Sequence, residues 1–250
     1  MEWNYNDTDL DVLYRKWKKL GWGVTGNSYD GDIDIEKLIT ETTIAARYDG
    51  RLFQWFRTWI RNYNDLINKK RLIRFLNTAD TAVLGAVLDL AIENGADPNF
   101  IVVISKCKPY QKPELFFKNI ENVPFYIDQE IRNSLPVYTK WGLYCTEVEF
   151  YTDANYNRDY VLKNNGLLAL RSILGANIRA EILYKLLTGA GIAVKKLSNE
   201  IGYSYSSVYM EVLSLKRNGL LSEKDEGRYH KLYLSAKGTT LIKNINSLFA

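Results

Sequence analysis

Three successive stretches in the last third of the chain repeat apolar residues at helical spacing. They cover residues 178–187, 194–201 and 204–218, and within each the apolar side chains lie mostly three or four positions apart. A glycine follows each stretch, and glycine readily adopts the left-handed conformation that ends a helix. Ser204 stands where its hydroxyl can cap the first turn of the third stretch. The pattern predicts three short helices. Their inward-facing residues are Ile178, Ile182, Leu183, Leu186, Leu187, Val194, Leu197, Ile201, Val208, Val212 and Leu215.

The chain then changes to the two-residue alternation of a β-strand. Residues 220–225 and 229–234 both alternate in this way, and the polar segment Asp225–Arg228, which contains a glycine, lies between them. We therefore predict a β-hairpin directly after the third helix.

Three short helices followed by a hairpin with a basic tip is the order of a winged helix-turn-helix. Over this stretch, roughly the last third of the chain, the sequence resembles the MarR/ArsR-like winged-helix DNA-binding superfamily. The resemblance implies that residues 166–250 form a DNA-binding domain whose third helix enters the major groove. The residues that carry it are Leu197, Ile201, Gly202, Tyr203, Ser204, Ser207, Val208, Leu215, Gly219, Leu220 and Leu221.

The resemblance also implies which side chains meet double-stranded DNA. Serines at the start of the third helix donate to phosphates, tyrosines pack on sugars or thymine methyls, and flanking cations reach the backbone. The front of this helix has no Arg, Lys, Asn or Gln, so no two-point reading of a base is predicted. The expected contact residues are Lys195, Lys196, Ser204, Tyr205, Ser206, Ser207, Tyr209, Met210, Lys216, Arg217 and Arg228.

The first part of the chain repeats the helical spacing in longer stretches. Short polar or glycine-containing turns separate them, and Asp32 or Asp34 is placed to cap the second. The pattern predicts a helical bundle, or a short helical solenoid, within a first domain of residues 1–165. The expected helices are residues 9–20, 35–46, 51–63, 65–76 and 81–94.

The middle of the chain contains all five prolines, between residues 98 and 136. Because proline lacks a backbone donor and breaks helices, we expect short elements and irregular chain here. The predicted elements are a strand at 101–104, helices at 114–120 and 125–132, extended chain at 141–151, a linker or loop at 152–165, and a connecting helix at 167–174.

Charge is distributed unevenly along the 250 residues. The net charge is +4, but residues 166–250 contain 12 Lys and Arg against 6 Asp and Glu, a balance of +6. A basic domain favours a polyanionic partner. No apolar run approaches the roughly 20 residues that span a bilayer, so we expect no membrane contact. With only Cys107 and Cys145, a disulfide framework is not expected and a reducing cytoplasm fits.

Residues with catalytic or metal-binding potential are few, and we predict no enzyme, cofactor or metal site. Asp30, Asp32 and Asp34, followed by Glu41, have the spacing of a calcium loop, but Ile35 replaces the glycine that the turn requires. A helix cap or a solvated acidic turn is the favoured interpretation. The single histidine, His230, falls in the predicted hairpin and is interpreted as a surface or phosphate-contacting residue.

A second cluster combines aromatic residues with arginines between residues 47 and 63. The favoured interpretation is a packed core with a solvated rim, and the alternatives are cation–π pairs inside the fold or a surface for nucleic acid or an acidic partner. Its members are Arg47, Arg51, Phe53, Trp55, Phe56, Arg57, Trp59, Arg61 and Tyr63.

Together these patterns predict a DNA-binding transcriptional regulator. The first domain would supply dimerisation, contact with a protein partner or sensing of a small effector, and a homodimer would read two half-sites. Two alternatives remain: an interaction adaptor whose winged helix does not bind DNA, and a nucleic-acid-processing enzyme that uses Asp30, Asp32 and Asp34.

Overall fold

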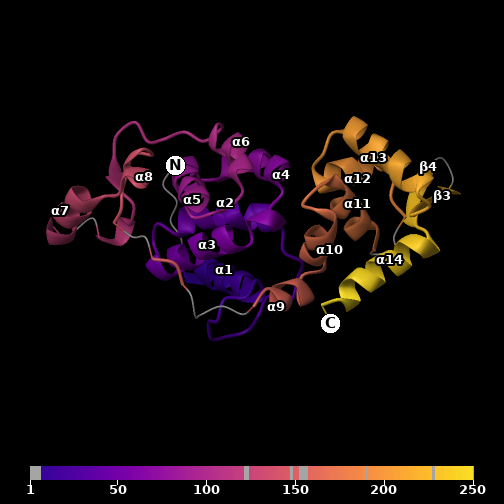
Figure 1. Cartoon of the computed structure of the whole chain (residues 1–250), viewed down its shortest axis with the longest axis horizontal. Helices are drawn as coiled ribbons and strands as arrows, with labels where there is room; N and C mark the ends of the chain where they lie inside the picture. Colours follow the sequence, from indigo (N-terminus) through magenta and orange to yellow (C-terminus); the bar gives the residue numbers. More distant parts are fainter. Residues whose placement is uncertain are drawn as a thin grey trace. The chain divides into compact units, whose positions relative to one another are not determined.

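The computed structural model describes residues 7–120, 124–146, 149–151, 157–187, 189, 191–226 and 229–249. It is mainly α-helical, as predicted, with a few short strands (Figure 1). The chain divides into two compact units, Met1–Tyr156 (unit 1) and Asn157–Ala250 (unit 2). No helix among the described residues is both long and apolar enough to cross a membrane.

Unit 1 begins with a group of helices and ends with shorter elements (Figure 1). The helices α1, α2, α3 and α5 correspond to predicted helices, and the predicted helix at 65–76 is divided into shorter pieces. The elements are α1 (Asp7–Lys19), α2 (Ile35–Ala45), α3 (Gly50–Asn62), η1 (Asn64–Leu66), α4 (Lys69–Arg74), η2 (Leu76–Thr78), α5 (Thr81–Glu93), η3 (Pro98–Phe100), α6 (Ile101–Ile104), β1 (Glu114–Leu115), η4 (Lys118–Ile120), α7 (Pro124–Asn133), α8 (Pro136–Thr139) and β2 (Leu143–Tyr144).

Tryptophans form much of the core of unit 1. Trp17, Trp55 and Trp59 are fully buried, and the Trp17 ring lies within 6.4 Å of both other rings, measured between centroids. The Trp17 Nε1–H donates to Thr42 Oγ1 at 2.9 Å, and the Trp59 Nε1–H donates to the carbonyl of Leu20 at 3.2 Å. The indole N–H groups of Trp17 and Trp59 are thus satisfied inside the core, whereas that of Trp55 is buried without a hydrogen-bond partner among the described residues.

Arginines of the aromatic cluster form cation–π pairs within the fold. Arg57 is buried, lies 4.4 Å from the Phe53 ring centroid and donates to the Tyr138 hydroxyl at 3.1 Å. Arg61 lies 4.3 Å from the Phe150 ring centroid. The aromatic residues of the cluster are therefore core, with Arg57 and Arg61 against rings and Arg51 exposed at the rim, and Trp55 and Trp59 do not form a surface.

Two predicted elements in the middle of the chain are wrong. The predicted strand at 101–104 is the helical turn α6, which continues from η3 after Asp97 caps that turn. Val103 and Ile104 are buried while Ile101 and Val102 are exposed, a one-sided burial that a helical turn provides. The predicted helix at 114–120 instead contains strand β1, which pairs in parallel with β2, and the turn η4.

Helix α7 agrees with the prediction for 125–132 but has no buried residue. The predicted extended chain at 141–151 contains only the short strand β2 within the described part, and residues 147 and 148 lie outside it. Of the predicted linker 152–165, residues 152–156 lie outside the described range, and residues 158–163 form a helix rather than a loop.

Unit 2 contains the elements predicted for the end of the chain together with two that were not foreseen, α9 and α14. Its core gathers Ile182, Leu197, Val208, Leu232 and Ile242 from different elements, all fully buried. The two strands pair antiparallel, with Leu221 opposite Leu234 and Glu226 opposite Tyr229. The elements are α9 (Arg158–Lys163), α10 (Gly166–Leu174), α11 (Ile178–Leu187), α12 (Val194–Ile201), α13 (Tyr205–Arg217), β3 (Leu221–Glu226), β4 (Tyr229–Leu234) and α14 (Ala236–Ser247).

Candidate nucleic-acid interface and a polar pocket

Helix α13 has one buried face and one exposed face. Val208, Val212 and Leu215 are buried in unit 2. On the other face Tyr205 and Met210 are 53% and 64% exposed. The first two turns of the helix therefore expose large side chains, and these are among the residues predicted from the sequence to contact DNA.

Serines cap the exposed end of α13. Ser204 Oγ accepts from the backbone N–H of Ser207 at 3.2 Å, as predicted for the N-cap. Its hydroxyl also lies 2.7 Å from the Ser207 hydroxyl and 3.2 Å from that of Ser206. All three serines are exposed. They form a small cluster of hydroxyl groups beside the positive end of the helix dipole, an environment that favours an anion.

The rings of Tyr205 and Tyr209 stack on each other at the surface. Their centroids are 5.9 Å apart and their planes differ by 14°. Both rings line a groove of about 400 Å³, together with Lys195 in the first turn of α12 and Glu223 and His230 of the hairpin. This groove brings the start of α12, the exposed face of α13 and the hairpin to one site.

Some of the Lys and Arg side chains predicted to contact DNA lie against carboxylates in the described part of the structure, and others do not. Lys216 forms an ion pair with Glu223, and Lys196 lies 3.8 Å from Glu200. Lys195 and Arg217 are exposed and form no ion pair with any other described residue. Because exposed ion pairs contribute only about 0–1 kcal/mol, a phosphate can compete with Glu223 for Lys216.

The sequence analysis makes predictions for two residues of the hairpin, Arg228 and His230. Arg228 lies outside the described residues, so its predicted position at the tip is not described. His230 is exposed and contacts the Asp225 carboxylate, in agreement with its interpretation as a surface residue.

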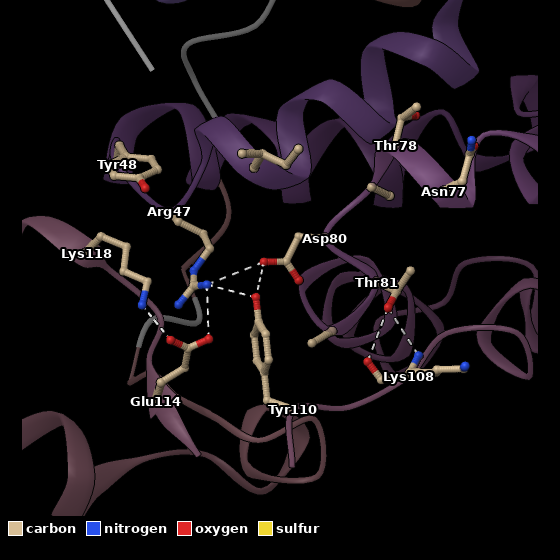
Figure 2. Close-up of a pocket in the computed structure, with 13 residues that line it drawn as sticks. Arg47, Tyr48, Asn77, Thr78, Asp80, Thr81, Lys108, Tyr110, Glu114 and Lys118 are labelled. Atoms are coloured by element: carbon tan, nitrogen blue, oxygen red, sulfur yellow. Dashed lines mark hydrogen bonds and ion pairs between the residues drawn. The ribbon is translucent and has the colours of Figure 1, made fainter. Parts of the chain in front are cut away.

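A separate pocket lies within unit 1, between the end of α2 and the start of α5 (Figure 2). Its volume is about 590 Å³, within the range of roughly 300–1,000 Å³ that is usual for small-molecule sites. Its walls mix charged, hydroxyl and apolar side chains. The lining residues are Ile44, Arg47, Tyr48, Asn77, Thr78, Ala79, Asp80, Thr81, Ala82, Lys108, Tyr110, Glu114 and Lys118.

Arg47 forms one wall of this pocket and joins segments that are distant in sequence. Its Nε donates to the carbonyl of Phe116 at 3.0 Å and its Nη2 to that of Leu115 at 2.8 Å. Its Nη1 lies 3.4 Å from Asp80 Oδ2 and 3.2 Å from Glu114 Oε1. The guanidinium thus fixes strand β1 against the turn that precedes α5.

Tyr110 lies in the same wall of the pocket. We call the connected side chains of this wall the Arg47 network; they are Arg47, Asp80, Tyr110, Glu114 and Lys118. The Tyr110 hydroxyl accepts from Arg47 Nη1 at 2.9 Å and donates to Asp80 (Figure 2). Burial and the neighbouring Asp80 carboxylate raise the pKa of Tyr110 above its usual value, so its phenol stays protonated. Burial raises the pKa of Glu114, but the Lys118 hydrogen bond and the Arg47 charge outweigh it and lower this pKa overall.

In the acidic stretch of Asp30, Asp32 and Asp34, the last residue has a structural role. Asp34 caps α2 by accepting from the backbone N–H of Lys37, as predicted for either Asp32 or Asp34, and it forms an ion pair with Arg71. Within the described ranges, no group of three or more His, Cys, Asp or Glu side chains is arranged to hold a metal ion.

The exposure of Tyr205, Tyr209 and Met210 on α13 follows the prediction from the sequence, whereas no sequence pattern predicts the pocket. Arg47 belongs to the aromatic cluster in the sequence, and its partners Asp80, Tyr110 and Glu114 lie 33 to 67 residues further along the chain. No local pattern links them.

Compared with known proteins, the chain matches no family model, no curated protein and no solved structure.

Proposed function

We propose that this chain is a DNA-binding transcriptional regulator that contacts duplex DNA through unit 2, as a winged helix-turn-helix. The observation that carries the proposal is the exposed face of α13, where Tyr205, Tyr209 and Met210 stand opposite a buried apolar face. The order α11, α12, α13, β3 and β4 supports the winged-helix classification.

Charge supports the same surface. Unit 2 contains 14 Lys and Arg against 7 Asp and Glu, a balance of +7, while unit 1 contains 19 against 22, a balance of −3. Lys195 and Arg217, which form no ion pair with described residues, are available to phosphates. The serine cluster adds hydroxyl donors at the start of α13.

A salt-dependent gel shift with the full chain tests the proposal. We expect a complex with random duplex DNA at low salt, with an affinity that falls steeply as the salt concentration rises. Lys195→Ala should weaken binding to all DNA sequences alike and reduce the slope of log K against log salt concentration by about 1. Tyr209→Ala should change the preference between DNA sequences.

The matched control is Lys243→Ala, which removes an exposed lysine from α14. It should leave DNA binding unchanged. Absence of a complex at about 50 mM salt, where phosphate contacts are strongest, would refute the proposal. Equal weakening by Lys195→Ala and Lys243→Ala would show that the wrong surface was chosen.

A protein-interaction adaptor is the second candidate function. It is favoured by the chemistry of the exposed face, because Tyr and Met are enriched at the cores of protein interfaces and Tyr205, Tyr209 and Met210 have no cation among them. An adaptor would give no duplex complex at low salt, so the same gel shift separates the two functions.

We also propose that the regulator acts as a homodimer, since two copies are needed to read two half-sites about one helical turn apart. Sedimentation of the full chain at micromolar concentration should reveal a species of twice the monomer mass. Monomer alone would remove this part of the proposal and leave the DNA contact intact.

A further inference from the structure

We propose that the pocket of unit 1 binds a phosphorylated sugar, either a free sugar phosphate or the ribose phosphate of a mononucleotide. The proposal does not depend on DNA binding, because every lining residue of the pocket belongs to unit 1.

The charge balance of the pocket favours a ligand with negative charge. Two cations, Arg47 and Lys118, are matched by two carboxylates, Asp80 and Glu114, through the contacts of the Arg47 network. Lys108 is the remaining charged group of the lining. It is exposed and forms no ion pair with any described residue. The lining therefore has one uncompensated positive charge.

The donors on one side of the pocket suit a phosphate group. Figure 2 shows Asn77, Thr81 and Lys108 on the side away from Glu114 and Lys118. The Thr81 hydroxyl already donates to the backbone carbonyl of Lys108 at 3.3 Å, so the amide of Asn77 and the ammonium group of Lys108 are the donors on this side, and a phosphate monoester offers three strong acceptor oxygens. A carboxylate offers only two oxygens, and lysine is a common partner of phosphate. The phosphate is therefore assigned to this side.

The opposite side suits a body rich in hydroxyl groups. Glu114 is about one third exposed in its side chain, and an ionised carboxylate has more acceptor positions than its contacts with Arg47 and Lys118 fill. The lowered pKa of Glu114 keeps it ionised at neutral pH. Sugar hydroxyls can donate to this carboxylate, while Ile44, Ala79 and Ala82 provide apolar contact.

Calorimetric titration of the full chain tests the site with two esters, glucose 6-phosphate and adenosine 5′-monophosphate, and with glucose and adenosine as the unphosphorylated controls. We expect one or both esters to bind with a Kd below about 1 mM, and glucose and adenosine to bind at least about tenfold more weakly. Binding of the glucose ester alone identifies a free sugar phosphate, and binding of the nucleotide alone identifies a mononucleotide.

Single substitutions test whether the esters bind in the pocket of unit 1. Lys108→Ala should weaken ester binding about tenfold, whereas Lys106→Ala, a matched change at an exposed lysine outside the pocket lining, should not. Asn77→Ala provides a second test that keeps the charge, and it decides the matter if Lys108→Ala does not fold.

Three results would overturn the proposal. They are failure of both esters to bind, equal loss in Lys106→Ala and Lys108→Ala, and loss of binding in a Lys195→Ala, Lys196→Ala double variant. The last result would place the esters on unit 2.

Discussion

Replacing Arg47 by methionine should strongly destabilise unit 1, because this guanidinium serves five acceptors at once. The change leaves the carbonyls of Leu115 and Phe116 without their donor and removes the ion pair with Asp80, which is 90% buried in its side chain. Each buried acceptor left unpaired costs about 1–3 kcal/mol. Breaking a buried ion pair from one side costs about 3–5 kcal/mol in total, so we expect a loss of about 3–5 kcal/mol.

Tryptophan fluorescence during urea unfolding measures this loss in unit 1 alone. All six tryptophans lie between residues 3 and 141, so none belongs to unit 2. A loss of about 3–5 kcal/mol is a large share of the roughly 5–15 kcal/mol that stabilises a typical domain, and the midpoint should fall accordingly. Far-UV circular dichroism of the same samples follows the helices of both units.

Two further variants make the result specific to the Arg47 network. Arg51→Met removes an exposed arginine close by in sequence and should change the free energy of unfolding by less than about 0.5 kcal/mol. Arg47→Lys should recover little, because one ammonium group cannot reach acceptors arranged around a planar guanidinium. The reasoning is refuted by a loss below about 1 kcal/mol in Arg47→Met, or by equal losses at positions 47 and 51.

The remaining predictions concern a tight contact and a thiol. Gly85→Ala should destabilise unit 1 by about 1–3 kcal/mol despite the better helix propensity of alanine, because an added Cβ would lie 2.5 Å from the Trp141 ring; a higher melting temperature would contradict this. Burial raises the pKa of Cys107 to about 12, against about 8.5 for an unfolded cysteine. This thiol is therefore protonated at pH 8 and should react with a disulfide reagent much more slowly in the native chain than in urea. Because the folded pKa is the higher one, its contribution to stability is lost as the pH rises from about 8.5 towards 12, and native labelling as fast as that of free cysteine would refute the assignment.

The elements of unit 2 from α10 to β4 could be predicted because their signals are local. Ser204 caps α13 through a bond to a residue three positions away, and Gly202 ends α12 in the left-handed conformation at φ 73°. The inward positions of α13 follow directly from the spacing of Val208, Val212 and Leu215. Each of these features is decided within a few residues, so the sequence contains them without tertiary information.

The errors in unit 1 arise where distant residues decide the local structure. The β-branched run Ile101–Ile104 favours a strand by propensity, but the capped turn at Pro98 continues through it as a helix. Strand β1 exists because Glu114 and Leu115 pair with residues 143 and 144 and because Arg47 binds the carbonyl of Leu115. The pocket depends on the same long-range contacts, so neither it nor β1 could be predicted from short-range patterns.

The convergence of several segments on Arg47 has a consequence for how this protein can diverge between relatives. The carboxylate of Asp80, the phenol of Tyr110 and the carboxylate of Glu114 all meet one guanidinium. A change at one of these positions leaves the others mismatched in charge or in donors. Viable lineages should therefore exchange these four side chains as a group or retain them together, so that they covary even though up to 67 residues separate them.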